Sequence, residues 1–287
     1  MPSSRRTSIR PGRKTSADRT SRRSERLVPF DRGEGPPLIV IPGVQGRWEW
    51  MRPPLRALQA TCRTITYTLC GDAGAAMRFD RALGFENYMR QLDEIFERTG
   101  ISRAAVCGVS YGGFIALRYA ATRPERVSAL ILVSAPAPGW SPSARQKRYL
   151  ARPWLSAPAF VATAPARVWP EIASALPDWR SRLTFTVRHS AQVVSAPMIP
   201  SRMANRVHLQ QQADFGDDPG KVRAPTLVIT GEDHLDQVVP PPVTRWYLDL
   251  ISGSRYEKLT GTGHIGMLTQ PKRFAEIVSG FVHAHSH

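Results

Sequence analysis

The chain has 287 residues, enough for one large domain with an insertion or for two small domains. It carries 39 Lys and Arg against 23 Asp and Glu, which gives a formal net charge of +16. Three cysteines (Cys62, Cys70 and Cys107) are too few for a disulfide framework, and no apolar run approaches the roughly 18 residues of a membrane span. We therefore expect a cytoplasmic globular protein without a membrane span.

Residues 1–26 differ in composition from the rest of the chain. They contain nine Lys and Arg, two acidic residues, many Ser and Thr, and almost nothing apolar. Such a segment cannot bury a core, so we expect a disordered basic arm. Basic arms can contact nucleic acid or anionic membranes, but we favour a solvated tail or a start codon placed too far upstream, and nucleic acid is not expected as a partner.

From residue 27 onward, short apolar runs alternate with stretches of helical period. The pattern predicts strands over 38–41, 63–69, 104–107, 128–133, 225–230 and 255–259. It predicts helices over 54–59, 85–99, 111–122, 243–251 and 271–282. This alternation is typical of an α/β fold with a mainly parallel sheet flanked by helices.

Residues 139–220 break the alternation and are rich in Pro, Arg, Ala and Trp, with helical stretches over 179–195 and 201–214. We expect a helical insertion that divides the sheet domain into a first part, 27–138, and a second part, 221–287. An insertion at this point would lie over the carboxyl edge of the sheet, where sites in such sheets gather.

The most informative stretch is Gly108-Val109-Ser110-Tyr111-Gly112, between a predicted strand and a predicted helix. A serine at such a corner adopts a strained backbone, and the glycines two before and two after it avoid collisions with neighbouring elements. The corner exposes the Ser110 hydroxyl beside the first N–H groups of the helix. This geometry suits a nucleophile that attacks a carbonyl.

A nucleophilic serine needs a base and a carboxylate that orients the base, and both follow in the chain. His264 lies on a glycine-rich loop after the strand predicted over 255–259. Asp236 and Asp233 both lie on the loop after the strand predicted over 225–230. We prefer Asp236, because the proline and apolar pair that follow it close the loop, and we keep Asp233 as the alternative.

The developing oxyanion needs two backbone N–H donors. One is expected from Tyr111, directly after the serine. The other is expected from the loop after the strand over 38–41, where Val44 is the first choice and Gln45 the alternative, since Pro42 has no N–H. Trp48 and Trp50 follow this loop and are candidates for lining a substrate pocket.

The chain thus presents a strand, an oxyanion loop, a serine corner, an Asp loop and a His loop in this order. Because of this order, residues 27–282 resemble the α/β-hydrolase superfamily, in its serine-nucleophile branch. The resemblance implies an α/β-hydrolase sheet and makes the insertion similar to that family's helical cap. One departure is Pro42-Gly43 at the start of the oxyanion loop, where many members have His-Gly. This departure leaves the loop geometry and the substrate class open.

The expected function is that of a serine hydrolase that cleaves an ester, thioester or related acyl bond of a small, largely apolar molecule. It would use Ser110, His264 and Asp236 and pass through an acyl-enzyme, without cofactor or metal. Alternatives on the same residues are an acyltransferase, a C–C hydrolase or a cofactor-free perhydrolase. A binding protein on a hydrolase scaffold is the alternative of another class. The sequence indicates no oligomeric state.

Overall fold

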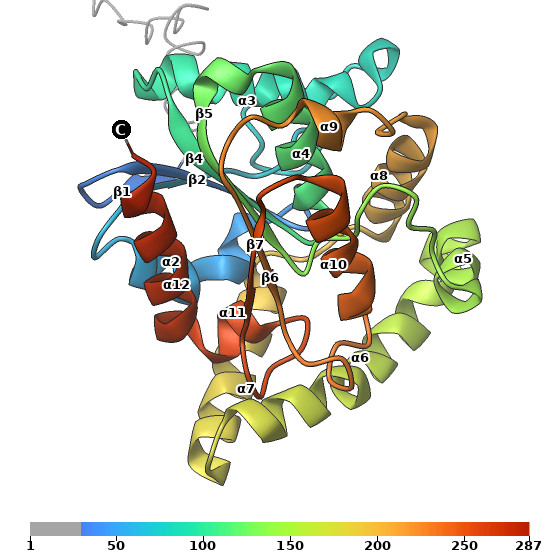
Figure 1. Ribbon diagram of the computed structural model, residues 1–287. Coiled ribbons are helices and arrows are strands. Elements are labelled where there is room, and N and C mark those ends of the chain that lie inside the picture. Colours follow the sequence, from blue (N-terminus) through green and yellow to red (C-terminus); the bar gives the residue numbers. More distant parts are fainter. Residues whose placement is uncertain (1–29, 287) are drawn as a thin grey trace, which may run out of the picture.

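The computed structural model describes residues 30–286 and is built around one seven-stranded sheet (Figure 1). The strands lie in the order β1-β3-β2-β4-β5-β6-β7, and every neighbouring pair is parallel except β1 with β3. Their bounds are β1 Phe30–Arg32, β2 Pro37–Ile41, β3 Arg63–Thr66, β4 Ala104–Val109, β5 Val127–Val133, β6 Thr226–Thr230 and β7 Arg255–Lys258. The expected α/β fold is confirmed, with the short antiparallel β1 added at one edge.

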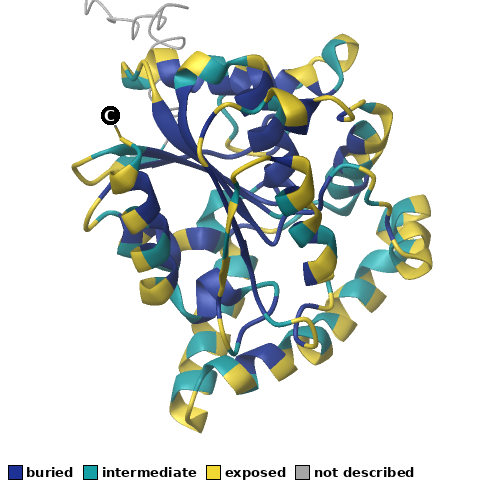
Figure 2. Cartoon of the chain, in the orientation of Figure 1, coloured by how far each residue is buried: buried dark blue, intermediate teal, exposed yellow. Residues whose placement is uncertain are grey.

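The central strands are apolar along their whole length because helices cover both faces of the sheet. Every residue of β4 and of β5 is buried. Helices α2 (Arg52–Leu58), α11 (Gly266–Thr269) and α12 (Pro271–Ala284) pack against one face. Helices α3 (Glu86–Thr99), α4 (Gly112–Thr122) and α10 (Pro241–Leu250) pack against the other. The central strands of the sheet thus form the buried middle layer of three layers (Figure 2).

Short helical turns complete the body of the protein. These are the 3₁₀ helices η1 (Trp48–Met51), η2 (Arg81–Leu83) and η3 (Pro124–Arg126), and the one-turn helix α9 (Asp218–Lys221). The strand predicted over 63–69 ends at Thr66, and residues 67–70 continue as buried irregular chain. The basic arm expected over 1–26 lies outside the described residues.

Four longer helices lie between β5 and β6, and we call them the cap segment: α5 (Ala144–Ala151), α6 (Pro153–Ala175), α7 (Trp179–Ser195) and α8 (Pro200–Gln212). Helix α7 matches the predicted range, and α8 is close to it. Helix α6 was not predicted, because Pro158, Pro165 and Pro170 lie inside it and proline ordinarily interrupts a helix. The boundaries 139–220 of a separate insertion remain a prediction.

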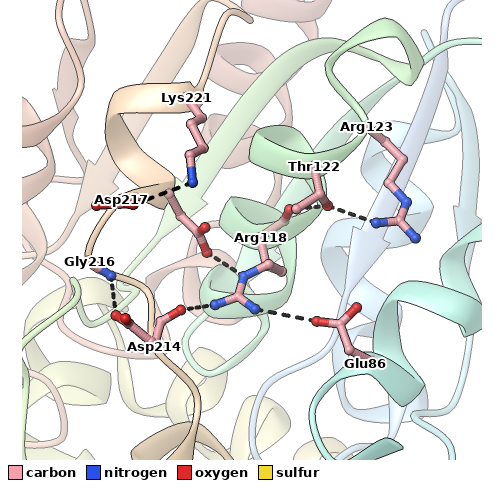
Figure 3. Close-up of polar contacts among 9 residues, drawn as sticks. Glu86, Arg118, Thr122, Arg123, Asp214, Gly216, Asp217 and Lys221 are labelled. Atoms are coloured by element: carbon pink, nitrogen blue, oxygen red, sulfur yellow. Dashed lines mark hydrogen bonds and ion pairs between the residues drawn. The ribbon is translucent and has the colours of Figure 1, made fainter.

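Arg118 anchors helix α4 to its surroundings through every part of its guanidinium group (Figure 3). Its Nε donates to Asp218 of α9, its Nη2 to the carbonyl of Asp214, and its Nη1 to Glu86 of α3 at 3.3 Å. The guanidinium also lies 4.7 Å from the centre of the Phe215 ring. Because Ser110 lies two residues before the start of α4, this set of contacts also fixes the helix that follows the serine.

We expect Arg118→Ala to lower the free energy of unfolding by about 3 kcal/mol, because it leaves the largely buried Asp218 carboxylate without its cation. Urea unfolding followed by circular dichroism measures this change. The control is Arg273→Ala, which removes an exposed ion pair with Glu276 and should cost less than about 1 kcal/mol. Equal losses in the two variants would contradict the anchoring role.

Candidate active site

Ser110 lies at the corner between β4 and α4 with a left-handed φ of 52°. Few non-glycine residues adopt such a conformation, and it persists only where the surroundings enforce it. Here the helix turns back so tightly that a Cβ on Gly108 would lie 2.4 Å from the carbonyl oxygen of Gly112. The Ser110 N–H meanwhile donates to Val133 of β5 at 2.8 Å. The two glycines that the sequence argument required are therefore both needed for space.

The loop after β2 lies directly beside the serine. A Cβ on Gly43 would be 3.5 Å from the Cβ of Ser110. Residues 43–46 form a tight turn, in which Gly46 N–H donates to the Gly43 carbonyl at 2.9 Å and Gly46 has a φ of 74°. Within residues 30–286, the N–H groups of Val44, Gln45 and Tyr111 donate to no protein acceptor. These three groups are thus available for an anion next to Ser110.

Asp236 and His264 come from different loops and meet. The His264 Nδ1 lies 3.0 Å from Asp236 Oδ2, and the Asp236 side chain is only 1% exposed. The other carboxylate oxygen, Oδ1, accepts the N–H groups of Val238 and Val239, both at 2.9 Å. The carboxylate is therefore fixed by its own loop, and its free edge faces the imidazole.

The other two acids of this loop point elsewhere. Asp233 is exposed and makes a two-fold contact with Arg245 at 2.7 and 2.9 Å. Glu232 accepts from Lys258 at 3.2 Å. Of the two aspartates weighed from the sequence, the structure brings Asp236 to His264 and directs Asp233 to an arginine.

The surroundings of His264 change its acid–base behaviour. Burial lowers the pKa of the imidazole, but the nearby Asp236 and Glu171 carboxylates outweigh this effect, so the pKa is raised above its usual value. Within the described part of the chain, Ser110 makes no side-chain hydrogen bond to His264. This bond is often long without substrate and shortens in the bound complex. The His264–Asp236 pair and Ser110 thus lie on loops at the same edge of the sheet.

The two tryptophans expected near a pocket have structural contacts. Trp48 packs 4.9 Å from the Phe30 ring and lies under the guanidinium of Arg52. Trp50 donates from its indole N–H to the carbonyl of Ala196 at 2.9 Å, at the end of α7. Neither contact joins them to Ser110, and their role in a substrate pocket remains a prediction.

Glu171 is a site residue that the sequence did not reveal. It is 1% exposed and comes from α6 of the cap segment. Its Oε2 accepts the N–H of Ile265, the residue after His264, at 3.1 Å, while Oε1 has no protein partner. Burial raises the pKa of this carboxyl to about 7. The available signal was that Glu171 is the single acidic residue within the long apolar stretch of α6.

Arg206 of α8 reaches the loop after β2 from the other side. It donates from Nη1 to the Val44 carbonyl at 2.9 Å and from Nη2 to the buried Asp72. Arg202 binds the second oxygen of Asp72 at 3.1 Å. In addition, the Tyr111 hydroxyl donates to the Arg206 carbonyl at 2.9 Å. This arginine fixes the carbonyl of a residue whose N–H we consider for the oxyanion.

A cavity of about 460 Å³ opens on the outer side of this arginine contact. Its lining includes Cys70, Tyr88, Arg202 and Leu209. Ser110 and His264 do not line it, so we do not assign it to the candidate reaction. The arrangement of the serine corner, the His264–Asp236 pair and the free N–H groups defines the candidate active site instead.

The chain belongs to the alpha/beta hydrolase family, whose model matches residues 38–277. A Klebsiella pneumoniae protein named as the carbamate hydrolase RutD is 27% identical over 253 residues, which cover 85% of this chain and 90% of that protein. A second relative with this name, from Azorhizobium caulinodans, is 26% identical over 259 residues. These residues cover 87% of this chain and 92% of that protein.

Solved structures share the fold. An esterase from Thermogutta terrifontis has a TM-score of 0.73 at 21% identity, and the match covers 90% of this chain and 93% of the esterase. The enol-lactonase from Burkholderia xenovorans LB400 has a TM-score of 0.70 at 20% identity, with 89% and 95% covered. These likenesses confirm the α/β-hydrolase sheet expected from the sequence.

The raised pKa of Glu171 gives a pH-dependent stability. Its folded pKa of about 7 exceeds the unfolded value of 4.5, so the wild type loses stability as the pH rises from 4.5 through 7. Glu171→Gln keeps an acceptor for Ile265 but cannot ionise. Between pH 5 and 8, we expect the wild type to lose about 3 kcal/mol relative to this variant.

Urea unfolding at the two pH values measures this difference. The matched control is Glu257→Gln on β7, an exposed carboxyl, which should leave the pH dependence as in the wild type. A Glu171→Gln variant with the wild-type pH dependence would show that Glu171 ionises as an ordinary surface carboxyl.

Proposed function

We propose that the protein is a serine hydrolase that cleaves an ester, thioester or related acyl bond of a small, largely apolar substrate. The observation that carries this proposal is the 3.0 Å contact of His264 Nδ1 with a buried, doubly anchored Asp236. With Nδ1–H donated to Asp236, the neutral imidazole presents its Nε2 lone pair as a general base. Ser110, at its strained corner on the same edge of the sheet, is the proposed nucleophile.

In the proposed reaction, His264 Nε2 takes the proton of the Ser110 hydroxyl while its oxygen attacks the substrate carbonyl. The tetrahedral oxyanion accepts hydrogen bonds from the N–H groups of Tyr111 and Val44, with Gln45 as the alternative to Val44. Each such donor is worth about 3–4 kcal/mol of barrier. The imidazolium then protonates the leaving alcohol or thiol, and the acyl group remains on Ser110.

Water completes the cycle in the same way. His264 takes a proton from a water molecule, the resulting hydroxide attacks the acyl-enzyme, and the proton passes back to Ser110 as the acid leaves. The Asp236 carboxylate stabilises each imidazolium that forms. None of these steps requires a metal or a cofactor.

The names of the relatives support carbonyl chemistry for this site. One group is named for carbamate hydrolysis, and structural neighbours are an enol-lactonase and an esterase. An acyltransferase, C–C hydrolase or perhydrolase would use the same serine with another acceptor or bond, and identification of the products distinguishes these from ester hydrolysis. A binding protein would form no covalent adduct at Ser110.

The first test is Ser110→Ala against Ser134→Ala. Both serines have a left-handed φ, 52° and 43°, so both variants place alanine in a strained corner. We expect Ser110→Ala alone to abolish labelling by a fluorophosphonate and to lower kcat on p-nitrophenyl esters by about 10⁶-fold. A wild type that neither reacts with the probe nor hydrolyses esters of graded chain length would favour the binding protein.

The second test separates the two aspartates. Asp236→Ala should lower kcat by about 10⁴-fold, while Asp233→Ala, which removes an exposed pair with Arg245, should stay within a few-fold of the wild type. Because Asp236 raises the pKa of His264, kcat/KM of the wild type should rise with pH through a value above 6.5. In Asp236→Asn, this rise should move to lower pH. An unshifted profile would show that Asp236 does not act through His264.

A further inference from the structure

The cap segment carries most of the exposed large apolar side chains in the described part of the chain. Eight of the ten lie on α6 and α7, and the remaining two, Trp246 and Leu250, lie on α10. We call the eight the apolar cap face: Trp154, Leu155, Val161 and Trp169 on α6, and Trp179, Leu183, Val187 and Val194 on α7. Soluble monomers rarely leave such side chains clustered in water, so a partner is indicated.

The exposed side of α6 is free of charge over four turns. Between positions 154 and 170, every exposed residue is Trp, Leu, Val, Ala or Pro, with Thr163 as the one polar exception. The charged residue in this range, Arg167, is folded back: its guanidinium lies 4.7 Å from the Phe160 ring and donates to Thr163 at 2.7 Å. Between positions 154 and 170, the helix therefore presents an uncharged and mostly apolar side outward.

The exposed side of α7 is an apolar stripe with basic flanks. Trp179, Leu183 and Val187 follow one another at intervals of four, which places them in a row on one side of the helix. Arg180 and Arg188 are exposed beside this row. Both helices form the outer edge of the molecule, away from the sheet, and exposed stretches follow them both (Figures 1 and 2).

The positive charge around the apolar cap face indicates what kind of partner it binds. Residues 144–195 contain eight Lys and Arg but two acids, of which Glu171 is buried and Asp178 caps the start of α7. A second copy of the chain would bring equally basic helices and no free acid to the contact. The headgroups of an anionic lipid surface would instead neutralise the arginines while its acyl chains take up the tryptophans.

We propose that the cap segment binds the surface of an anionic lipid membrane through the apolar cap face, with α6 and α7 lying in the interface. Within residues 30–286, no helix has the length and apolar character that crossing a bilayer requires. The binding is peripheral, and it combines burial of apolar side chains with attraction between the basic residues and the lipid charge.

The test uses the full-length protein and sedimentation with lipid vesicles. One set is phosphatidylcholine with about one quarter phosphatidylglycerol, and the other is phosphatidylcholine alone. The cap variant combines Leu155→Ser, Trp169→Ser and Leu183→Ser. The matched control combines Trp246→Ser and Leu250→Ser, the exposed apolar pair on α10. We expect the cap variant to partition about tenfold or more weakly onto the anionic vesicles, and the control to partition as the wild type does.

A second variant changes charge alone. Arg180→Gln with Arg188→Gln should weaken binding at low salt by several-fold and reduce its salt dependence, with the apolar residues intact. Quenching of tryptophan fluorescence by brominated lipid gives a second readout. It reports on residues 30–286 alone, since residues 1–29 and His287 contribute no tryptophan. Ester hydrolysis of a soluble substrate and thermal unfolding of each variant confirm that it is folded.

Three outcomes would overturn the proposal. The wild type could fail to sediment with anionic vesicles. The cap variant could bind as tightly as the wild type, which would assign binding to another basic surface. Sedimentation velocity could show a wild-type dimer that the cap variant dissociates, in which case a second copy covers the face.

Discussion

The close approach of backbone to backbone at the β4–α4 corner is the constraint on which the site depends. A Cβ on Gly112 would lie 2.6 Å from the Ile41 carbonyl of β2, and one on Gly113 would lie 2.3 Å from the Ala135 Cβ. Because these positions have no side chain, the helix start packs directly against two neighbouring strand ends. The left-handed Ser110 then cannot relax without pulling β4 and α4 apart. The strain is maintained by two fully buried strands, whose packing is worth far more than the roughly 1–3 kcal/mol that such a conformation costs.

Three buried carboxylates surround this corner, and their surroundings give them different properties. Asp236 receives two backbone N–H groups and an imidazole, Asp72 receives two arginines, and Glu171 receives one backbone N–H. Hydrogen bonds to a buried carboxylate offset the loss of water around its ionised form. At Glu171 burial dominates and raises the pKa of the carboxyl to about 7, because the backbone N–H groups beside it offset the burial only in part. The buried Glu171 carboxyl thus accepts the backbone N–H of Ile265, the residue that follows the partly exposed His264.

The sequence predicted the sheet well because its strands are continuous apolar runs and its body helices have a clear apolar side. It predicted the Ser110 corner for a local steric reason, and it placed the acid within one loop. It did not reveal Glu171, Arg206 or Asp72, because their importance arises from contacts between segments more than ninety residues apart, such as Glu171 with Ile265. It also missed α6, whose prolines argue against a helix by local rules. Whether Trp48 and Trp50 line a pocket remains a prediction.

Each helix of the cap segment contacts a different loop of the site. Gln146 of α5 donates to Val238 on the Asp loop at 3.2 Å, and Glu171 of α6 accepts from Ile265 on the His loop. The end of α7 accepts the Trp50 indole, and Arg206 of α8 donates to Val44. These contacts are single hydrogen bonds, which contribute about 1 kcal/mol each, and the outer sides of α6 and α7 remain apolar and uncovered. A partner that binds those outer sides therefore acts on helices whose inner sides position the acid loop, the histidine loop and the oxyanion loop together.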